Sequence, residues 1–314
     1  MAREITVYEV GPRDGLQNES LQVPLEDKLA LIERLADAGL RRIEATSFVS
    51  PRWIPQLADA AEVVGRLPRR PGLGYVVLVP NPKGLERLRE SLDRAGADRP
   101  RVDAAVFLSA SETHNRKNIN KGVHETLELY EEVVAQALAA GLAVRGYVST
   151  AFGCPYEGHV SPDRVVEIAT RLLGLGCHQV SLGDTIGVGV PDQVRRLADT
   201  LLSRLRPEQL ALHLHDTRGT ALANVLAGLE AGIGTFDASI GGLGGCPYAP
   251  GASGNLATED LVYMLRGMGF ETGVDFEKLI AAGELAQRIV GRKLPGKALQ
   301  AELGARERAA AGHA

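Results

Sequence analysis

The chain has 314 residues, of which 45% are hydrophobic and 24% charged, and its formal net charge is -4. This composition is typical of a globular protein with a large core and excludes a mostly disordered chain. The small negative charge argues against binding to nucleic acid or to a membrane surface, because both need a broad cationic face. No apolar run near the first residues is long enough for a signal peptide or a spanning helix, so we expect a cytoplasmic protein.

Eight short segments rich in β-branched and other apolar residues recur along the chain, and each predicts a strand. They are Ile5–Val10, Arg42–Thr46, Tyr75–Val79, Val102–Leu108, Val144–Ser149, Gln179–Leu182, Leu210–His215 and Thr235–Ile240. The segments between them place apolar residues at helical spacing. These predicted helices are Leu25–Ala38, Ile54–Leu67, Gly84–Arg94, Val123–Ala140, Pro162–Leu173, Pro191–Leu205 and Ala221–Ala231, followed after the eighth strand by Thr258–Met268 and Phe276–Val290.

The regular alternation of strands and helices predicts a parallel sheet, and eight such units are the number that closes a barrel. An open, doubly wound sheet is the competing architecture. We favour an α/β fold of the parallel (β/α)8 TIM-barrel type with extra C-terminal helices. Residues 1–303 are expected to form one domain, and the small, charged stretch 304–314 is expected to be frayed.

Polar residues gather where the predicted strands end. Arg13 and Asp14 follow the first strand, Glu44 ends the second, Asp184 follows the sixth, His213 and His215 end the seventh, and Asn255 follows the eighth. In a parallel barrel all these strand ends open on one face. Residues far apart in the sequence are therefore expected to meet there.

The histidine pair is the sharpest local signal. In a strand, the spacing of His213 and His215 puts both imidazoles on one side and leucines 210, 212 and 214 on the other. In a barrel the leucines then face the helices and the histidines face the axis, a geometry suited to one metal ion. Histidines that are hydrogen-bonded within the core are the alternative.

Two imidazoles need oxygen ligands to complete a metal site. Asp14 is the natural candidate, because strands one and seven are both odd-numbered and contribute to the same interior layers. Asn255 would add an amide oxygen and leave positions open for substrate and water. This mixture of ligands suits Mg²⁺ or Mn²⁺, whereas zinc, the alternative, usually closes a four-ligand set in structural sites.

Arg13, Glu44 and Cys246 are the candidate catalytic groups. Arg13 would stabilise an enolate oxygen beside the metal, although an ion pair alone would also explain it. Glu44 is interpreted as an orienter of Arg13 or of the metal water, with a general base as the alternative. Cys246 lies in a glycine-rich segment that would let it exchange a proton with substrate, but such segments also occur in phosphate cradles and plain turns.

The odd number of cysteines argues against a disulfide framework. Cys154 is expected near the same face as the site, whereas Cys177 precedes the sixth strand and is interpreted as structural. Asp216, which follows the histidines, is interpreted as a cap of the next helix.

Five segments together resemble the hydroxymethylglutaryl-CoA lyase family. They are Val10–Glu19, Glu44–Pro51, Ser181–Gly187, His213–Thr217 and Gly241–Asp260, and the resemblance extends to about Gly273. It implies that Asp14, His213, His215 and Asn255 bind the metal, that Arg13 stabilises the enolate, and that Cys246 is the catalytic thiol. Glu44 and Asp184 would be functional neighbours, and Arg13 and Gln17 would contact the substrate.

The reaction implied is cleavage of 3-hydroxy-3-methylglutaryl-CoA to acetyl-CoA and acetoacetate by a homo-oligomer, either dimer or tetramer. The chain departs from the family where Arg218 and Thr220 replace a tyrosine and a glutamine, which leaves the acyl preference open. A lyase for a longer-branched 3-hydroxyglutaryl-CoA is therefore an alternative.

Two further readings compete. Related synthases and aldolases share the barrel, but the synthases typically read Leu-Arg-Asp-Gly-Glu-Gln where this chain has Pro12 to Gln17. A catalytically inactive scaffold would be expected to lose ligands, and all four proposed ligands are present.

Overall fold

A computed structural model describes residues 4–96, 99–245 and 254–312. Its eight strands are β1 Thr6–Glu9, β2 Arg42–Ser47, β3 Gly74–Leu78, β4 Val102–Ser109, β5 Val144–Ser149, β6 Gln179–Asp184, β7 Leu210–Leu214 and β8 Thr235–Ala238. They pair in sequence order into a closed barrel, in which β8 pairs with β1. All the pairings between neighbouring strands are parallel, so the predicted barrel is confirmed and the open sheet was wrong.

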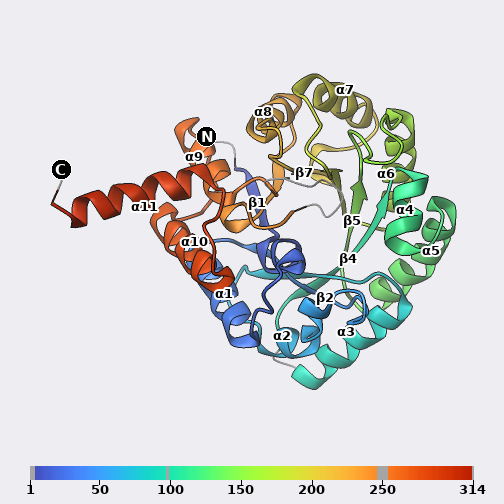
Figure 1. Ribbon diagram of the computed structural model, residues 1–314. Coiled ribbons are helices and arrows are strands. Elements are labelled where there is room, and N and C mark those ends of the chain that lie inside the picture. Colours follow the sequence, from blue (N-terminus) through green and yellow to red (C-terminus); the bar gives the residue numbers. More distant parts are fainter. Residues whose placement is uncertain (1–3, 97–98, 246–253, 313–314) are drawn as a thin grey trace.

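The helices form a layer around this barrel (Figure 1). They are α1 Leu25–Asp37, α2 Ala60–Arg66, α3 Pro82–Ala95, α4 Glu112–Ile119, α5 Val123–Ala139, α6 Pro162–Leu175, α7 Pro191–Leu202, α8 Ala221–Ala231, α9 Thr258–Gly267, α10 Phe276–Val290 and α11 Lys297–Ala310. Most lie close to their predicted limits. A close approach of α8 to β7 shows how the layers meet, since a Cβ on Gly228 would come within 2.6 Å of Leu212 Cδ1.

Four local elements differ from the prediction. The segment predicted as one helix from Ile54 instead begins with a short 3₁₀ turn, η3 Pro55–Leu57, and becomes α2 only at Ala60. Helix α4 was missed because it carries little apolar periodicity, although the Ser111 hydroxyl accepts a hydrogen bond from the backbone N–H of His114 and caps it. After β1, residues Gly11–Gly15 form a π-helical turn, η1.

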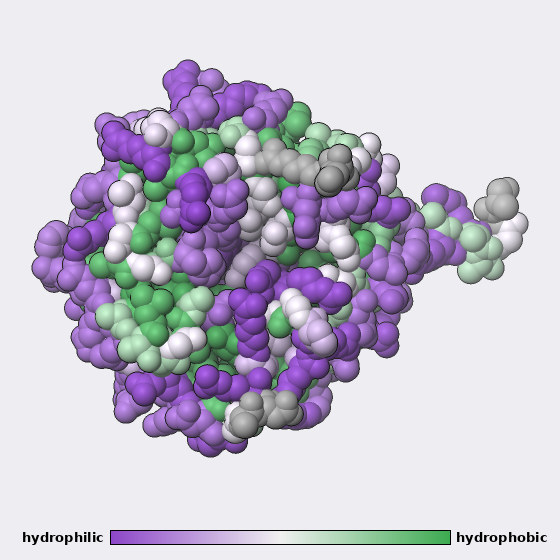
Figure 2. Space-filling view, turned by 180° about the vertical axis from the view of Figure 1, so that it is seen from behind, coloured by the Kyte–Doolittle hydropathy of each residue, from purple (hydrophilic) through white to green (hydrophobic). Residues whose placement is uncertain are grey.

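The fourth difference concerns the C-terminal stretch, which was predicted to be frayed from Gly304. Helix α11 instead continues to Ala310, and it projects from the body of the molecule in both overall views (Figures 1 and 2). Leu299 near its start is fully buried, and Leu303 packs against the core. This packing of its first turns anchors a helix whose remaining residues are small or charged.

The face seen from behind is mostly hydrophilic, with hydrophobic side chains scattered among charged ones (Figure 2). Within the described ranges, no helix combines the length and the apolar character that crossing a membrane would need. Inside the barrel, by contrast, an ion pair between Arg145 and Asp237 is completely buried. The barrel interior is therefore partly polar beneath its open end.

Candidate active site

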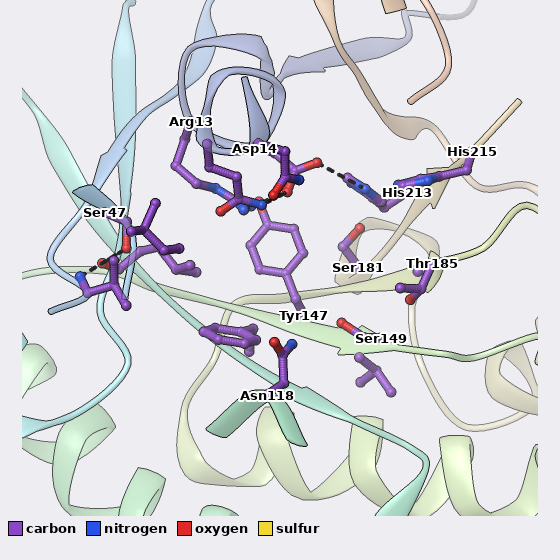
Figure 3. Close-up of a pocket in the computed structure, with 18 of the residues that line it drawn as sticks. Arg13, Asp14, Ser47, Asn118, Tyr147, Ser149, Ser181, Thr185, His213 and His215 are labelled. Carbon is purple, nitrogen blue, oxygen red and sulfur yellow. Dashed lines mark hydrogen bonds and ion pairs between the residues drawn. The ribbon is translucent and has the colours of Figure 1, made fainter. Parts of the chain in front are cut away.

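A pocket opens where the strands end, and several of the predicted site residues line it. Arg13, Asp14, Gln17, His213 and His215 are among its lining residues. In Figure 3 Asp14 and His213 point toward each other, and Tyr147 reaches toward Arg13 from across the pocket. The structure thus brings together side chains from the first, fifth and seventh strands or the turns that follow them.

The turn η1 holds Asp14 in place. The carbonyl of Val10 accepts hydrogen bonds from the backbone N–H groups of Arg13, Asp14 and Gly15. Gly11 is required here, because a Cβ on it would lie 2.6 Å from Glu9 Oε1. The Gly-Pro-Arg-Asp-Gly sequence therefore builds a tight turn that presents Arg13 and Asp14 at the barrel mouth.

Glu9, at the end of β1, ties this turn to the turn η5 (Ile240–Gly242) after β8. Its buried carboxylate accepts hydrogen bonds from the backbone N–H of Gly11 (2.7 Å) and of Ile240 (2.9 Å). The hydroxyl of Thr258, the first residue of α9, donates a third (2.6 Å). One carboxylate thus fixes the two loops that carry site residues, a role that sequence reasoning missed.

Asp14, His213 and His215 form the centre of the site. One potential ligand atom from each lies within 4.8 Å of the others, and His213 Nε2 is 3.9 Å from Asp14 Oδ2. Burial raises the pKa of Asp14, but Arg13 and His213 outweigh it and hold that pKa at about 2. Burial, with His213 next, lowers the pKa of His215 to about 4, so this imidazole stays neutral and available as a ligand.

Asn255 completes the cluster. Its amide nitrogen donates to Asp14 Oδ2 (2.8 Å) and to the carbonyl of Leu243 (3.0 Å). These two bonds fix the orientation of the amide and leave its Oδ1 atom free to bind another group. Both Asn255 Oδ1 and His215 Nδ1 are buried without a hydrogen-bond partner among the described residues. Buried polar atoms rarely stay unpaired. An unpartnered amide oxygen and an unpartnered imidazole nitrogen beside a carboxylate and a second imidazole fit a divalent cation bound with nitrogen and oxygen ligands.

Arg13 and Glu44 lie beside this cluster. Arg13 donates from Nη1 to Asp14 Oδ1 (2.6 Å) and from Nη2 to Glu44 Oε2 (2.8 Å). Burial raises the pKa of Glu44, while Arg13 lowers it in part. Glu44 is completely buried behind Arg13, which agrees with the orienting role rather than with a base facing the substrate.

Asp184, predicted to be a functional neighbour of the site, is the last residue of β6. Its two carboxylate oxygens accept the backbone N–H groups of Val188 and Gly189, each at 2.9 Å. Asp184 therefore shapes the loop after β6 and does not line the pocket. Arg218 reaches the same loop, where it donates to the carbonyls of Ile186 and Gly187.

Two interpretations of single residues agree with the structure. Asp216 Oδ1 accepts the backbone N–H of Ala221 (3.1 Å) at the start of α8, as expected of a cap. Burial raises the pKa of Cys177 to about 12, which suits a structural thiol. Cys154 Sγ donates to Ser111 Oγ (3.0 Å) and lies outside the pocket lining, and Cys246 lies outside the described residues.

Sequence reasoning missed three polar residues inside the barrel, of which Tyr147 lines the pocket and the other two do not. Tyr147 and Arg145 come from β5, and Asp237 comes from β8. Arg145 donates to both oxygens of Asp237 (2.7 and 3.1 Å) and to the hydroxyl of Tyr147 (2.7 Å). The available signal was a charged residue within each of two predicted strands, where a solvated face is not expected.

An eight-stranded parallel barrel whose strand ends carry a histidine and carboxylate cluster defines the chain as a (β/α)8-barrel protein with a candidate divalent-metal site. A family model described as HMGL-like matches residues 4–286, and the chain belongs to this family.

Relatives resemble the chain over nearly its whole length. Hydroxymethylglutaryl-CoA lyase YngG of Bacillus subtilis is 50% identical over 95% of this chain and 97% of its own length. The mitochondrial hydroxymethylglutaryl-CoA lyase of Bos taurus is 49% identical over 95% of this chain and 90% of its own length.

Solved structures agree with this assignment. The crystal structure of the B. subtilis HMG-CoA lyase has a TM-score of 0.91 at 49% identity, over 95% of this chain and 98% of that one. An HMG-CoA lyase from Acinetobacter baumannii in complex with coenzyme A and 3-methylmalate has a TM-score of 0.88 at 43% identity, over 95% and 94% of the two chains.

Proposed function

We propose that this protein is a divalent-metal-dependent carbon–carbon lyase that cleaves 3-hydroxy-3-methylglutaryl-CoA to acetyl-CoA and acetoacetate. The observation that carries the proposal is the convergence of Asp14, His213 and His215, beside Arg13, at the mouth of the barrel. Membership of the HMGL-like family, and the names of the relatives, support the same substrate. A cytoplasmic location and a homo-oligomeric assembly are parts of this proposal.

The proposed metal is Mg²⁺ or Mn²⁺, held by Asp14, His213, His215 and the amide oxygen of Asn255. When bound, such a cation would orient the substrate's C3 hydroxyl and lower its pKa. Removal of that proton lets the oxygen form a carbonyl as the C2–C3 bond breaks, and the bonding electrons pass to the thioester as an enolate. Protonation of the enolate carbon then yields acetyl-CoA, and the carbonyl product is acetoacetate.

Arg13 is proposed to stabilise the enolate. Its Nη1 and Nη2 atoms each use one N–H group, toward Asp14 and Glu44, and the side chain lines the pocket. A fixed guanidinium in a buried site strongly stabilises negative charge that develops on a nearby atom, because its orientation does not have to change during the reaction. Arginine carries five N–H donors, so each Nη group keeps a second N–H that would be the donor to the thioester oxygen.

A second hollow, which adjoins the pocket, offers a path for the coenzyme A portion. It shares Asn18 and Gly245 with the active pocket and is also lined by Arg292 and Lys293. Cationic side chains are suited to the phosphates of coenzyme A. We infer that the acyl group enters the pocket while the phosphates remain near Lys293.

Purified protein with Mg²⁺ or Mn²⁺ is expected to release acetyl-CoA from 3-hydroxy-3-methylglutaryl-CoA, and chelation is expected to stop the release. The measurement is acetyl-CoA formation against a panel that includes longer-branched 3-hydroxyglutaryl-CoA substrates and 2-oxo acids with acetyl-CoA. Readdition of the metal to the chelated protein is the control. Faster turnover of a longer-branched substrate would change the acyl assignment, and efficient condensation of a 2-oxo acid would establish a synthase instead.

Cys246 is proposed as the thiol that protonates the enolate. Cys246→Ala is therefore expected to lose turnover by about 10²- to 10⁴-fold, the usual contribution of a positioned acid or base. Mn²⁺ affinity, measured by titration, should change by less than about threefold, and Cys177→Ala is the matched control for loss of a thiol. Equal losses of turnover and metal affinity in Cys246→Ala would assign this cysteine a structural role.

A further inference from the structure

The metal-site cluster is one part of a circuit of polar side chains that closes on itself inside the barrel. From Asp14 it passes through Arg13 to Glu44, whose Oε2 also accepts a hydrogen bond from the Tyr147 hydroxyl (3.3 Å). Its lower half passes from Tyr147 through Arg145 to Asp237. Asp237 Oδ2 lies 3.3 Å from His213 Nδ1, and His213 Nε2 faces Asp14 at 3.9 Å.

Burial of the Arg145–Asp237 pair is costly. Both side chains are completely inaccessible to solvent, and desolvation of two such charges offsets much of their mutual attraction. Every contact that the structure gives Asp237 nevertheless favours its charged form: two hydrogen bonds from Arg145, one from the Ser181 hydroxyl (2.8 Å) and the imidazole of His213. A stability role alone would be served equally well by apolar side chains of similar volume.

The contact with His213 suggests what the pair does. A carboxylate that accepts two hydrogen bonds from an arginine has no proton to give, so the nitrogen facing it must be the donor. A neutral His213 then carries its proton on Nδ1 and keeps its lone pair on Nε2, the atom that faces Asp14. Its ring also meets Tyr147 edge-on, with centroids 6.4 Å apart, which restricts its rotation.

We propose that Asp237, clamped by Arg145, is a positioning residue that sets the tautomer of His213 and aims its Nε2 lone pair at the cation site. The proposal rests on the metal site proposed above. Metal-binding histidines commonly donate their other ring N–H to a carboxylate, and loss of that carboxylate typically costs about 10- to 100-fold in metal affinity. Arg145 would act indirectly, because it keeps the Asp237 carboxylate ionised and fixes its orientation.

The first test uses the metal-free wild-type protein. With histidine labelled with ¹⁵N in the ring, long-range ¹H–¹⁵N NMR at pH 8 distinguishes the two neutral tautomers, and a His213→Gln variant identifies the His213 signals. The proposal expects the proton on Nδ1. A proton on Nε2 would overturn it, and this outcome does not depend on any variant of Asp237 folding or on any metal being bound.

The second test is Asp237→Asn. Arg145 donates to both oxygens of Asp237, so in either orientation the amide turns its NH₂ group against a donor of Arg145. The clamp is therefore broken, and His213 Nδ1 loses its charged acceptor. We expect the NMR signals of the metal-free variant to show a larger share of the tautomer with its proton on Nε2, and its Mn²⁺ affinity, measured by electron paramagnetic resonance of free Mn²⁺, to fall by about 10- to 100-fold.

Gln179→Met provides the matched control. Gln179 Oε1 accepts a hydrogen bond from Arg145 Nε (3.0 Å), so this change loosens the same buried network without touching the contact between Asp237 and His213. Its Mn²⁺ affinity should stay within about threefold of wild type even if its melting temperature falls. Equal weakening by both variants, or retention of wild-type affinity and tautomer by Asp237→Asn, would overturn the proposal. A wild-type protein that binds no Mn²⁺ would instead contradict the proposed metal site, and the tautomer would still be measurable.

Discussion

Replacement of His213 by alanine is expected to lower kcat for 3-hydroxy-3-methylglutaryl-CoA cleavage by at least about 10³-fold, which corresponds to about 4 kcal/mol. The physical reason is that the change removes one of two imidazoles from a cluster whose ligand atoms lie within 4.8 Å of each other. It also leaves the Asp237 carboxylate without its imidazole partner. The loss should appear in Mn²⁺ affinity as well as in turnover, because binding of the cation requires these ligands.

His124→Ala is the matched control. His124 lies at the start of α5 with its side chain 83% exposed, and its imidazole faces Glu128 of the same helix. A melting curve of each variant separates loss of the ligand from loss of the fold. Wild-type Mn²⁺ affinity in His213→Ala would contradict the ligand assignment and favour a histidine that only packs and hydrogen-bonds in the core.

Arg13→Met is expected to reduce kcat by about 10²- to 10³-fold, as removal of a preorganised group that stabilises an oxyanion typically does. Metal affinity should change far less, because Arg13 holds Asp14 in place but is not a ligand. A loss of stability of about 3–5 kcal/mol is also expected, since Glu44 would stay buried without its cationic partner. Activity and stability therefore have to be measured together.

The double variant Arg13→Met, Glu44→Gln separates these two effects. A neutral amide at position 44 removes the uncompensated charge, so the melting temperature should recover toward that of wild type. The kcat should not recover, because the donor to the enolate oxygen is still absent. Recovery of both would show that Arg13 acts only as a partner of Glu44.

The strength of the sequence prediction differed between kinds of element. Strands bordered by helices could be predicted because apolar periodicity indicates which residues are buried. The strand Val144–Ser149, for example, was predicted with the limits that the structure shows. Helix α4 and helix α11 beyond Leu303 could not be predicted, because their sequences show little periodic spacing of apolar residues. Capping by Ser111 and the packing of Leu299 decide those elements.

The residues of the candidate site also differ in how well the sequence predicted their positions. Asp14, His213, His215 and Asn255 could be predicted because residues at the ends of parallel strands necessarily share one face, and the spacing of two histidines in a strand fixes their common side. Asp184 was placed at the same face for the same reason. Its contacts with the backbone of Val188 and Gly189 show that position at a strand end does not determine which way a side chain turns.

The sequence by itself determined the barrel, the face that holds the chemistry and the residue types available for a cation and an enolate, because periodicity and strand ends are local properties. Only the tertiary structure revealed the buried circuit through Tyr147, Arg145 and Asp237 and the turn that Glu9 fixes. The contact between Arg145 and Asp237 joins strands whose residues are 92 positions apart, and it forms only when the barrel closes. Hydrogen bonds of this kind depend on side-chain direction inside a closed sheet, which no local pattern encodes.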